Sequence, residues 1–386
     1  MRVCFLFNHF STHHVAHSAP FAFELSRRYE KAAVVVAFTS EEQREALVRV
    51  ASRYPGHRAE FVKLEIPALQ RWAARALSRL TFLAKRRTLA NNLEFFARFD
   101  AIVAPERTMV LLRTRYGLPD VKLINTRHGQ GDREGSVDER MLDVDLTLVA
   151  GRKYADRFSR RGLLRPGHYA IVGYPKFEVC EPHREKLKLF PDDRPVVLYN
   201  PHFDWRESSW STLGHEVLAW FGAHPEYNLV FAPHVVLFAR AWRHRARLAR
   251  RVRGFPNVRI DLGSEASVDM TYTYAADIYL GDASSQVYEF IKDPRPCVFL
   301  DAQHARGRDP ERYAHWRFGP VITSIGELGI ALRAAQEGWP TYEAEQRAGF
   351  SYTFSSEPEF TAAQRGADAI AEYLTEGAIS SARFLR

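Results

Sequence analysis

Short apolar runs alternate along the chain with longer stretches in which apolar residues recur every three or four positions. Runs of four to six apolar residues bounded by turn residues are typical of strands, and the longer periodic stretches are typical of helices. The apolar runs are 3–7, 33–38, 101–104, 122–125 and 146–149 in the first half, and 196–199, 229–232, 258–261, 278–281 and 297–300 in the second. This alternation predicts repeated strand–helix–strand units and parallel sheets.

The chain is too long for one ordinary hydrophobic core, because 386 residues are expected to divide into about two domains. Gly173-Tyr174-Pro175 and the charged, proline-containing stretch from Glu181 to Arg194 mark the expected hinge. We predict an α/β fold with two Rossmann-like, doubly wound domains, residues 1–178 and 179–350, that face each other across a cleft. A final helix over Glu359 to Glu376, within segment 351–386, is expected by analogy to pack back on the first domain.

The composition is that of a soluble globular protein, with 46% hydrophobic and 26% charged residues. We find no apolar run long enough to span a bilayer, and the apolar start of the chain is too short for a signal peptide. Cys4, Cys180 and Cys297 are odd in number and widely spaced, which fits reduced thiols and neither a disulfide framework nor a zinc site. We therefore expect a cytoplasmic protein.

The net charge of +8 predicts anionic partners, among them nucleotides, phosphopolymers, a membrane surface and nucleic acid. The basic residues gather in two clusters, Arg71 to Arg87 and Arg240 to Arg253. Ala68 to Asn91 has the pattern of a basic amphipathic helix. Two interpretations stay open for it: contact with the anionic inner face of the membrane, or a core-facing helix with a solvated face. The second cluster has no aromatic stripe, and we find no nucleic-acid motif, so nucleic acid is not an expected partner.

The stretch from Ala276 to Ile291 has the pattern of a strand, a turn of small residues and the start of a helix. Backbone N–H groups at a helix start attract anions, and Ser284 and Ser285 add hydroxyl donors. Asp282 and Glu289 bracket the turn, and an acid there is suited to a ribose hydroxyl. The competing interpretation is an ordinary helix cap, since Asp and Ser cap many helices.

Three other predicted strands also end in polar side chains. His128 follows strand 122–125, Asn200 and His202 follow strand 196–199, and His234 follows strand 229–232. A histidine at such an end is suited to general base catalysis or to phosphate contact, and hydrogen bonding to backbone is the alternative. Ligands of doubly wound sheets bind at the carboxyl ends of the strands, so we expect these loops to converge.

The early loop is rich in histidine. His9, His13 and His17 are spaced by four residues, which aligns them on a helix face, but the acidic ligand of common zinc motifs is absent. We therefore predict no metal site, and we assign His13, His14 and Arg127 to acceptor binding.

The motifs, in this order, resemble the CDP-glycerol glycerophosphotransferase family, and this resemblance implies a two-domain glycosyltransferase B (GT-B) fold. The resemblance rests on His128-Gly129, on Leu198-Tyr199-Asn200-Pro201, on Pro233-His234, and on the segment from Asp277 to Asp301 with Asp282-Ala283-Ser284-Ser285, Glu289-Phe290 and Pro296-Cys297-Val298-Phe299. It covers about residues 120 to 305. The chain departs from the family where Gln130-Gly131-Asp132 replaces Thr-Pro and where His202 to Arg206 replaces Thr-Trp-Arg.

The resemblance implies a metal-independent transferase that needs no cofactor and uses a nucleotide-diphosphate donor, with CDP favoured. It implies that His128 deprotonates an acceptor hydroxyl. It further implies that His234, Ser284 and Ser285 hold the donor phosphates and that Glu289 binds the ribose; we place Asp282, Asn200 and His202 in the same donor site. The acceptor is expected to be a cell-surface polymer or a lipid-linked molecule.

Two other functions remain open at this point. Asp143 to Lys176 also resembles the non-hydrolysing sugar-nucleotide 2-epimerases, so a UDP-sugar glycosyltransferase or a 2-epimerase is the alternative enzyme. A polyanion-binding protein is the alternative without catalysis, and the net charge is what favours it.

Overall fold

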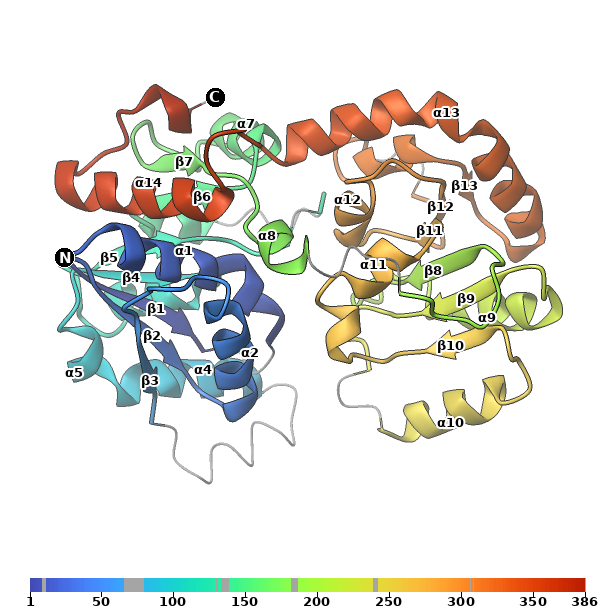
Figure 1. Cartoon of the computed structure of the whole chain (residues 1–386), viewed down its shortest axis with the longest axis horizontal. Helices are drawn as coiled ribbons and strands as arrows, with labels where there is room; N and C mark the ends of the chain where they lie inside the picture. Colours follow the sequence, from blue (N-terminus) through green and yellow to red (C-terminus); the bar gives the residue numbers. More distant parts are fainter. Residues whose placement is uncertain are drawn as a thin grey trace. The chain divides into compact units, whose positions relative to one another are not determined.

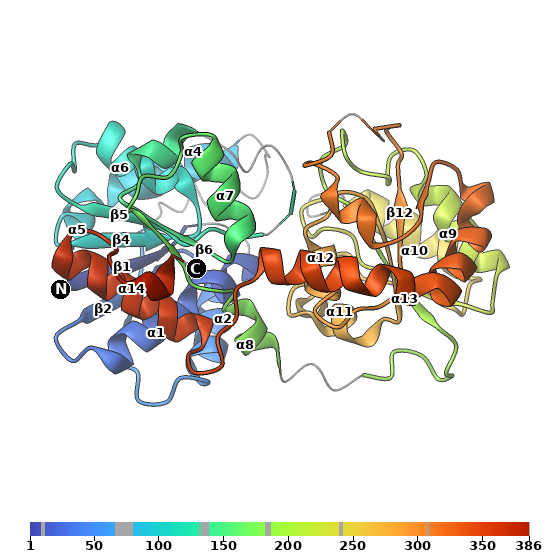
Figure 2. The same cartoon turned by 90° about the horizontal axis from the view of Figure 1, so that it is seen from above.

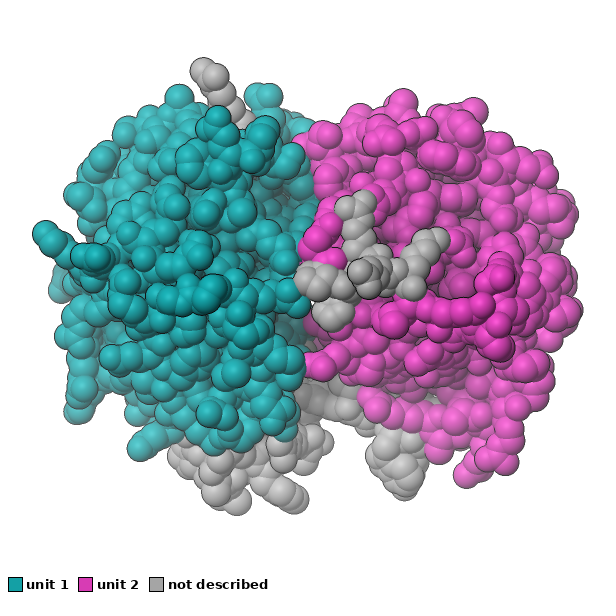
Figure 3. All heavy atoms as spheres, in the orientation of Figure 1, with its two compact units in different colours: residues 1–128, 137–179, 352–386 teal, residues 129–136, 180–351 magenta. Residues whose placement is uncertain are grey.

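Each half of the chain builds a parallel sheet whose strand order reverses once. The computed structural model describes residues 1–8, 12–65, 80–129, 131–132, 139–181, 187–238, 242–305, 307 and 309–385. The chain falls into two units, coloured separately in Figure 3. Unit 1 is Met1–His128, Val137–Val179 and Tyr352–Arg386, and unit 2 is Gly129–Ser136 and Cys180–Ser351.

Unit 1 contains a seven-stranded sheet in the order β3-β2-β1-β4-β5-β6-β7, and all of its pairings are parallel. The strands are β1 (Arg2–Phe7), β2 (Ala33–Phe38), β3 (Glu60–Lys63), β4 (Ala101–Ala104), β5 (Lys122–Asn125), β6 (Leu146–Val149) and β7 (Tyr169–Ile171). The central strands are apolar and buried along their length, as expected where helices cover both faces. The helices are α1 (Val15–Arg28), α2 (Glu41–Ala51), α4 (Leu80–Asn91), α5 (Leu93–Phe96), α6 (Leu111–Thr114), α7 (Arg152–Arg160), α8 (Lys176–Cys180) and α14 (Ala362–Glu376), labelled in Figure 1.

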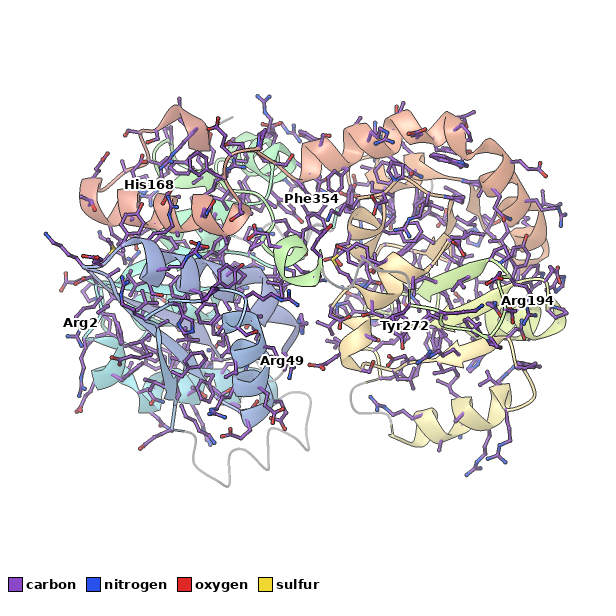
Figure 4. All side chains as sticks on the ribbon, viewed as in Figure 1. Arg2, Arg49, His168, Arg194, Tyr272 and Phe354 are labelled. Carbon is purple, nitrogen blue, oxygen red and sulfur yellow. The ribbon has the colours of Figure 1, made fainter. Side chains whose placement is uncertain are left out.

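Unit 2 contains a six-stranded sheet in the order β10-β9-β8-β11-β12-β13, again parallel throughout. Its strands are β8 (Val196–Asn200), β9 (Asn228–Phe231), β10 (Val258–Ile260), β11 (Ile278–Gly281), β12 (Cys297–Leu300) and β13 (Val321–Ile322). Its helices are α9 (Gly214–Ala223), α10 (Trp242–Val252), α11 (Thr271–Ala275), α12 (Gln286–Phe290) and α13 (Leu328–Thr353), the last belonging to unit 2 as far as Ser351. Tyr272 of α11, labelled in Figure 4, donates a hydrogen bond to Asp261 just beyond β10 at 2.7 Å.

The last long helix completes the core of unit 1. α14 packs along α1, and the two helices lie side by side in Figures 1 and 2. Arg28 donates two hydrogen bonds of 3.0 Å to Asp368 of α14, and the Tyr29 hydroxyl donates a third of 2.8 Å. Gly366 permits this close approach, because a Cβ there would lie 2.2 Å from the ring of Phe21.

The predicted α/β fold with parallel sheets is confirmed. All ten predicted strands are present, and their ends shift by at most one residue. The sequence pattern missed β3, β7 and β13. β7 and β13 have only three and two residues, and β3 (Glu-Phe-Val-Lys) carries charge at both ends. It also missed α13, a helix of 26 residues with a proline inside it.

The units differ from the predicted domain limits at one loop. Residues 129–136 were predicted in the first domain, and the structure groups them with unit 2. The chain passes from unit 1 to unit 2 again between Val179 and Cys180, inside the expected hinge, and 352–386 belongs to unit 1.

The predicted basic helix over Ala68 to Asn91 is described only in part. Residues 66–79 lie outside the described residues, and α4 begins at Leu80. Lys85 of α4 is buried and forms an ion pair with Glu106, so it is not a solvent-facing cation. Within the described ranges, no helix is long and apolar enough to cross a membrane.

Candidate active site

In unit 2 the strand order reverses between β8 and β11, which are neighbours in the sheet. Gly281, the last residue of β11, pairs with Asn200, the last residue of β8. The turn that follows β11, residues 282–285, therefore lies beside the loop that follows β8. We name residues 282–285 the anion turn. In doubly wound sheets, the carboxyl end of the strands at the reversal point is where ligands bind.

Asp282 begins the anion turn and holds the two loops together. Its side chain is 2% exposed, and its carboxylate accepts hydrogen bonds from the backbone N–H of His202 (2.9 Å), Ala283 (2.7 Å) and Ser209 (2.6 Å) and from the Ser209 hydroxyl (2.8 Å). Burial raises the pKa of Asp282 to about 6, although these hydrogen bonds favour its charged form. Asp282, which the sequence analysis placed in the nucleotide site, is thus surrounded by N–H and O–H groups of the protein.

The two serines of the anion turn have different environments. Ser284 is buried, and its hydroxyl donates to Asn200 Oδ1 at 2.6 Å, while Asn200 Nδ2 donates to the carbonyl of Ala232 at 2.6 Å. Ser285 is only partly buried, and within the described part of the chain no side chain hydrogen-bonds its hydroxyl. Ser285 is therefore the serine whose hydroxyl is available to a ligand.

The helix after the anion turn is short. α12 has five residues, so the electrostatic field at its start is weaker than the predicted helix would give. Glu289, expected to bind ribose, lies on α12 and is 6% exposed.

The histidines of unit 2 gather on the neighbouring loops. His202 Nδ1 accepts from the Asp204 N–H at 3.1 Å and lies 3.7 Å from the Glu207 carboxylate. The Phe203 ring contacts both His202 and His234, at centroid distances of 4.4 and 4.7 Å. His234 Nδ1 accepts from the Val236 N–H at 3.3 Å. A neutral His234 in this geometry carries its hydrogen on Nε2, the form that donates to a phosphate oxygen.

In unit 1 the strand order reverses between β1 and β4, and imidazoles gather at the carboxyl ends of its strands. His128 follows β5, and its ring lies 4.0 Å from that of His14 and 6.1 Å from that of His13, both in the short helix η1 (Thr12–His14). His9 lies outside the described residues. The His14 Nδ1 lies 3.6 Å from the Glu106 carboxylate, which follows β4.

His128 has the protonation state that a base requires. Its Nδ1 lies 3.1 Å from the carbonyl oxygen of Pro105. That oxygen only accepts, so Nδ1 carries the hydrogen and Nε2 keeps its lone pair. The residue retains a solvent-accessible side, while the protein atoms around its ring lower its pKa by desolvation and outweigh the opposite effect of Glu106.

Arg127, assigned above to acceptor binding, lies inside unit 1. Its side chain is 7% exposed, and its guanidinium stacks on the rings of Tyr154 and Phe158 at 4.5 and 4.6 Å. Burial lowers its pKa. Its backbone is left-handed (φ +57°), a rare and strained conformation for a residue with a side chain. This placement makes Arg127 a support for the His128 loop.

The sequence analysis missed several polar groups at these sites. In unit 1, the buried Lys85 pairs with the partly buried Glu106. In unit 2, Asp132, Tyr288 and His315 are buried and bonded to one another. The sequence marked Lys85 only as part of a basic helix and Asp132 only as part of the Gln130-Gly131-Asp132 departure. In the ranges that the structure describes, no group of His, Cys, Asp and Glu has the arrangement of a metal site, and the three cysteines are buried and form no disulfide.

Comparisons with known proteins support the fold and leave the family open. No family model matches the chain, and no curated protein matches it. Among solved structures, the wall teichoic acid polymerase TagF soaked with CDPG matches with a TM-score of 0.61 and 16% identity over 97% of this chain and 89% of TagF. The UDP-GlcNAc 2-epimerase of Neisseria meningitidis, bound to UDP-GlcNAc, matches with a TM-score of 0.61 and 14% identity, covering 97% of this chain and 100% of the epimerase.

A third solved structure, a putative UDP-N-acetylglucosamine 2-epimerase from Listeria monocytogenes, has a TM-score of 0.63 and 12% identity, covering 98% of this chain and 97% of its own. The fold is that of the glycosyltransferase B class. The structural matches establish the fold. Sequence identities this low do not decide between a polymerase and an epimerase.

Proposed function

We propose that the chain is a metal-independent transferase. It transfers a glycerophosphate or a glycosyl-type group from a nucleotide-activated donor, and we favour a CDP-linked donor. The acceptor is a hydroxyl of a cell-surface polymer or of a lipid-linked molecule. The observation that carries the proposal is the anion turn at the reversal point of the unit 2 sheet, with the Ser285 hydroxyl open to a ligand. The structures of TagF soaked with CDPG and of an epimerase bound to UDP-GlcNAc, which share this fold, support a nucleotide donor.

The roles of the unit 2 residues follow from their hydrogen bonds. We assign the donor phosphates to Ser285, to the Nε2–H of His234 and to backbone N–H groups of the anion turn, because donors fixed in advance stabilise the charge that develops on a leaving phosphate. The turn is positioned by two hydrogen bonds to the end of β8 and the loop after it. The Asp282 carboxylate accepts from the His202 N–H, and the Ser284 hydroxyl donates to Asn200. This set of donors neutralises the phosphates without a metal.

The proposed chemistry balances without a further reactant. The acceptor oxygen attacks the phosphorus that carries glycerol, a new P–O bond forms, and the P–O bond to CMP breaks. CMP leaves with the electron pair, and the acceptor proton passes to Nε2 of His128. Its lowered pKa keeps the imidazole neutral and able to accept that proton near neutral pH.

The charge distribution supports an anionic acceptor. The two basic clusters carry +6 (Arg71 to Arg87) and +7 (Arg240 to Arg253) without an acidic residue, so the remainder of the chain has a net charge of −5. On α10 and the turn after it, Arg247, Arg250 and Arg251 are exposed, as is Arg253, and residues 245–253 expose no large apolar side chain. Arginines pair with phosphates in bidentate fashion, so this surface fits a phosphate-bearing polymer or, for a peripheral protein on the inner face of the membrane, anionic head groups.

Nucleotide binding and product analysis test the proposal. In a thermal-shift panel of CDP, UDP, GDP and CMP, we expect CDP to raise the melting temperature most, because a ligand of the native state stabilises it. With CDP-glycerol and a glycerol phosphate oligomer, we expect release of CMP and growth of the oligomer. A panel in which none of the four nucleotides shifts the melting temperature contradicts the proposal.

The 2-epimerase is the second candidate, because solved epimerases share the fold over almost the whole chain. An epimerase needs no acceptor. Conversion of UDP-GlcNAc alone to its 2-epimer would favour it, whereas release of UDP only when an acceptor is present would favour a glycosyltransferase. Salt-sensitive binding of polyphosphate without binding of any nucleotide would favour the polyanion-binding protein.

A further inference from the structure

A buried polar network ties the loop after His128 to the anion turn within unit 2. Asp132, Tyr288 and His315 are each at most 3% exposed. The Tyr288 hydroxyl donates to both carboxylate oxygens of Asp132, at 2.9 and 2.7 Å. The backbone N–H of His315 and its ring Nδ1 lie 3.2 and 2.9 Å from Asp132 Oδ2. All three residues belong to unit 2, which is magenta in Figure 3.

His315 connects this network to the backbone of the anion turn. Its Nε2 lies 2.7 Å from the carbonyl oxygen of Asp282. A carboxylate oxygen and a carbonyl oxygen both accept hydrogen bonds, so the two ring nitrogens of His315 bridge Asp132 and the anion turn. The carbonyl of Asp282 thus bonds to His315, while its carboxylate bonds to the loop after β8.

The network holds glycine backbone against Ser285. A Cβ on Gly131 would lie 3.0 Å from Ser285 Cβ, 3.2 Å from its Cα and 3.4 Å from its N, so a side chain there would displace one of the two segments. A Cβ on Gly129 would lie 3.6 Å from Ser285 Oγ. The loop therefore lies directly over the serine whose hydroxyl is available to a ligand.

We propose that Asp132, Tyr288 and His315 are positioning residues that hold Gly129 and Gly131 over the anion turn and so form one wall of the phosphate site. The inference rests on the proposed function for its ligand, a nucleoside diphosphate. Gln130-Gly131-Asp132 is the point at which the chain departs from the family that it resembles. These residues explain the departure in structural terms. Gly131 lets the backbone approach Ser285, and Asp132 holds it there through its bonds to Tyr288 and His315.

The network itself is tested without a ligand. Removing Asp132 or His315 leaves buried polar groups unpaired, which risks unfolding, so the informative variant is Tyr288→Phe, which removes one hydroxyl. We expect at least fivefold faster amide hydrogen exchange at Gly131 and Asp132 and across 283–286. Tyr29→Phe is the matched control, since it removes a 2.8 Å bond from a tyrosine to Asp368 in unit 1 and should leave these amides unchanged.

The functional part is tested by CDP affinity, measured by calorimetry. We expect CDP to bind about fivefold more weakly to Tyr288→Phe, the loss of about one hydrogen bond, and about tenfold more weakly to Gly131→Ala. Gly254→Ala is the control for the second variant, because nothing lies within 4 Å of a Cβ at that position. We expect unchanged affinity in Gly254→Ala and Tyr29→Phe.

The outcomes separate this inference from the proposed function. Unchanged exchange in Tyr288→Phe overturns the network as a support of the loop. Faster exchange with unchanged CDP affinity in both Tyr288→Phe and Gly131→Ala overturns its role in the phosphate site. If the wild-type protein binds none of CDP, UDP and GDP, the proposed function fails, and with it the role in a phosphate site. The exchange result still decides whether the network holds the loop.

Discussion

The two sheets share one strand order at their centres and carry different chemistry at their carboxyl ends. In unit 1, His14 after β1 and His128 after β5 place imidazoles there. In unit 2, the loops after β8 and β9 also carry imidazoles, and the turn after β11 adds hydroxyls and a buried carboxylate. In unit 1, His128 has a lowered pKa, and its Nδ1 carries the hydrogen so that Nε2 keeps its lone pair. In unit 2, most polar groups bond to each other and leave Ser285 open.

The difference shows how one backbone plan carries unlike polar groups at the strand ends of the two units. Parallel strands bring their carboxyl ends to one side of a sheet whatever their sequence. The few residues after each strand then decide the chemistry. The loop after β5 supplies His128 next to a residue with a strained backbone, whereas the loop after β11 supplies small residues and two serines, of which only Ser284 bonds to a described side chain.

The comparison is tested most strongly by His128→Ala. Loss of a general base lowers rates by about 10²- to 10⁴-fold, and we expect that loss in kcat for transfer from CDP-glycerol. CDP affinity and melting temperature should stay close to those of the wild type, because the anion turn belongs to unit 2. His224→Ala is the matched control, since its Nδ1 also lies 3.0 Å from a backbone carbonyl, that of Trp220. Full activity in His128→Ala would show that His128 is not the general base.

A second test concerns two carboxyl groups whose pKa is raised by burial, one taken from each unit. Burial raises the pKa of Glu178 in unit 1 to about 7 and that of Asp282 in unit 2 to about 6. A carboxyl whose pKa is raised by folding stabilises the native state below its unfolded pKa, near 4.5 for Glu, and this stability is lost as the pH rises through the folded value. The free energy of unfolding should therefore fall between pH 4.5 and 7.

Glu178→Gln isolates the contribution of unit 1, because glutamine keeps an oxygen for the Ala363 N–H (3.0 Å) and cannot ionise. Relative to the wild type, we expect the variant to gain up to about 3 kcal/mol between pH 4.5 and 7.5, at 1.36 kcal/mol per pKa unit. Denaturant unfolding at several pH values measures this. Glu327→Gln is the control and should not show the gain, since the Ser324 hydroxyl lowers the pKa of that carboxyl. A pH dependence identical to that of the wild type would contradict the burial of a charged Glu178.

The sequence predicted the strands well and the side-chain environments poorly, for a physical reason. A run such as Ile278 to Gly281 is apolar because both faces of its strand are buried, so the pattern records the fold directly. Whether a polar residue faces a ligand depends on partners far along the chain. Arg127 stacks on rings some 30 residues later, and Asp132 bonds to His315, 183 residues away. No local pattern carries such pairings, so the strand ends were predictable and the bonding within the site was not.

The smallest effect distinguishes the two serines of the anion turn. Ser284 is buried and bonds to Asn200, so Ser284→Ala leaves an amide oxygen without its donor and should destabilise unit 2 by about 1–3 kcal/mol. Ser285 is partly exposed and bonds to no described side chain, so Ser285→Ala should leave the melting temperature unchanged and weaken CDP binding about tenfold, the loss of a hydrogen bond to a charged group. Melting curves with and without CDP measure both effects. The reverse result would be a loss of stability in Ser285→Ala and a loss of CDP affinity only in Ser284→Ala. It would contradict the assignment of Ser284 as the positioning residue and Ser285 as the binding residue.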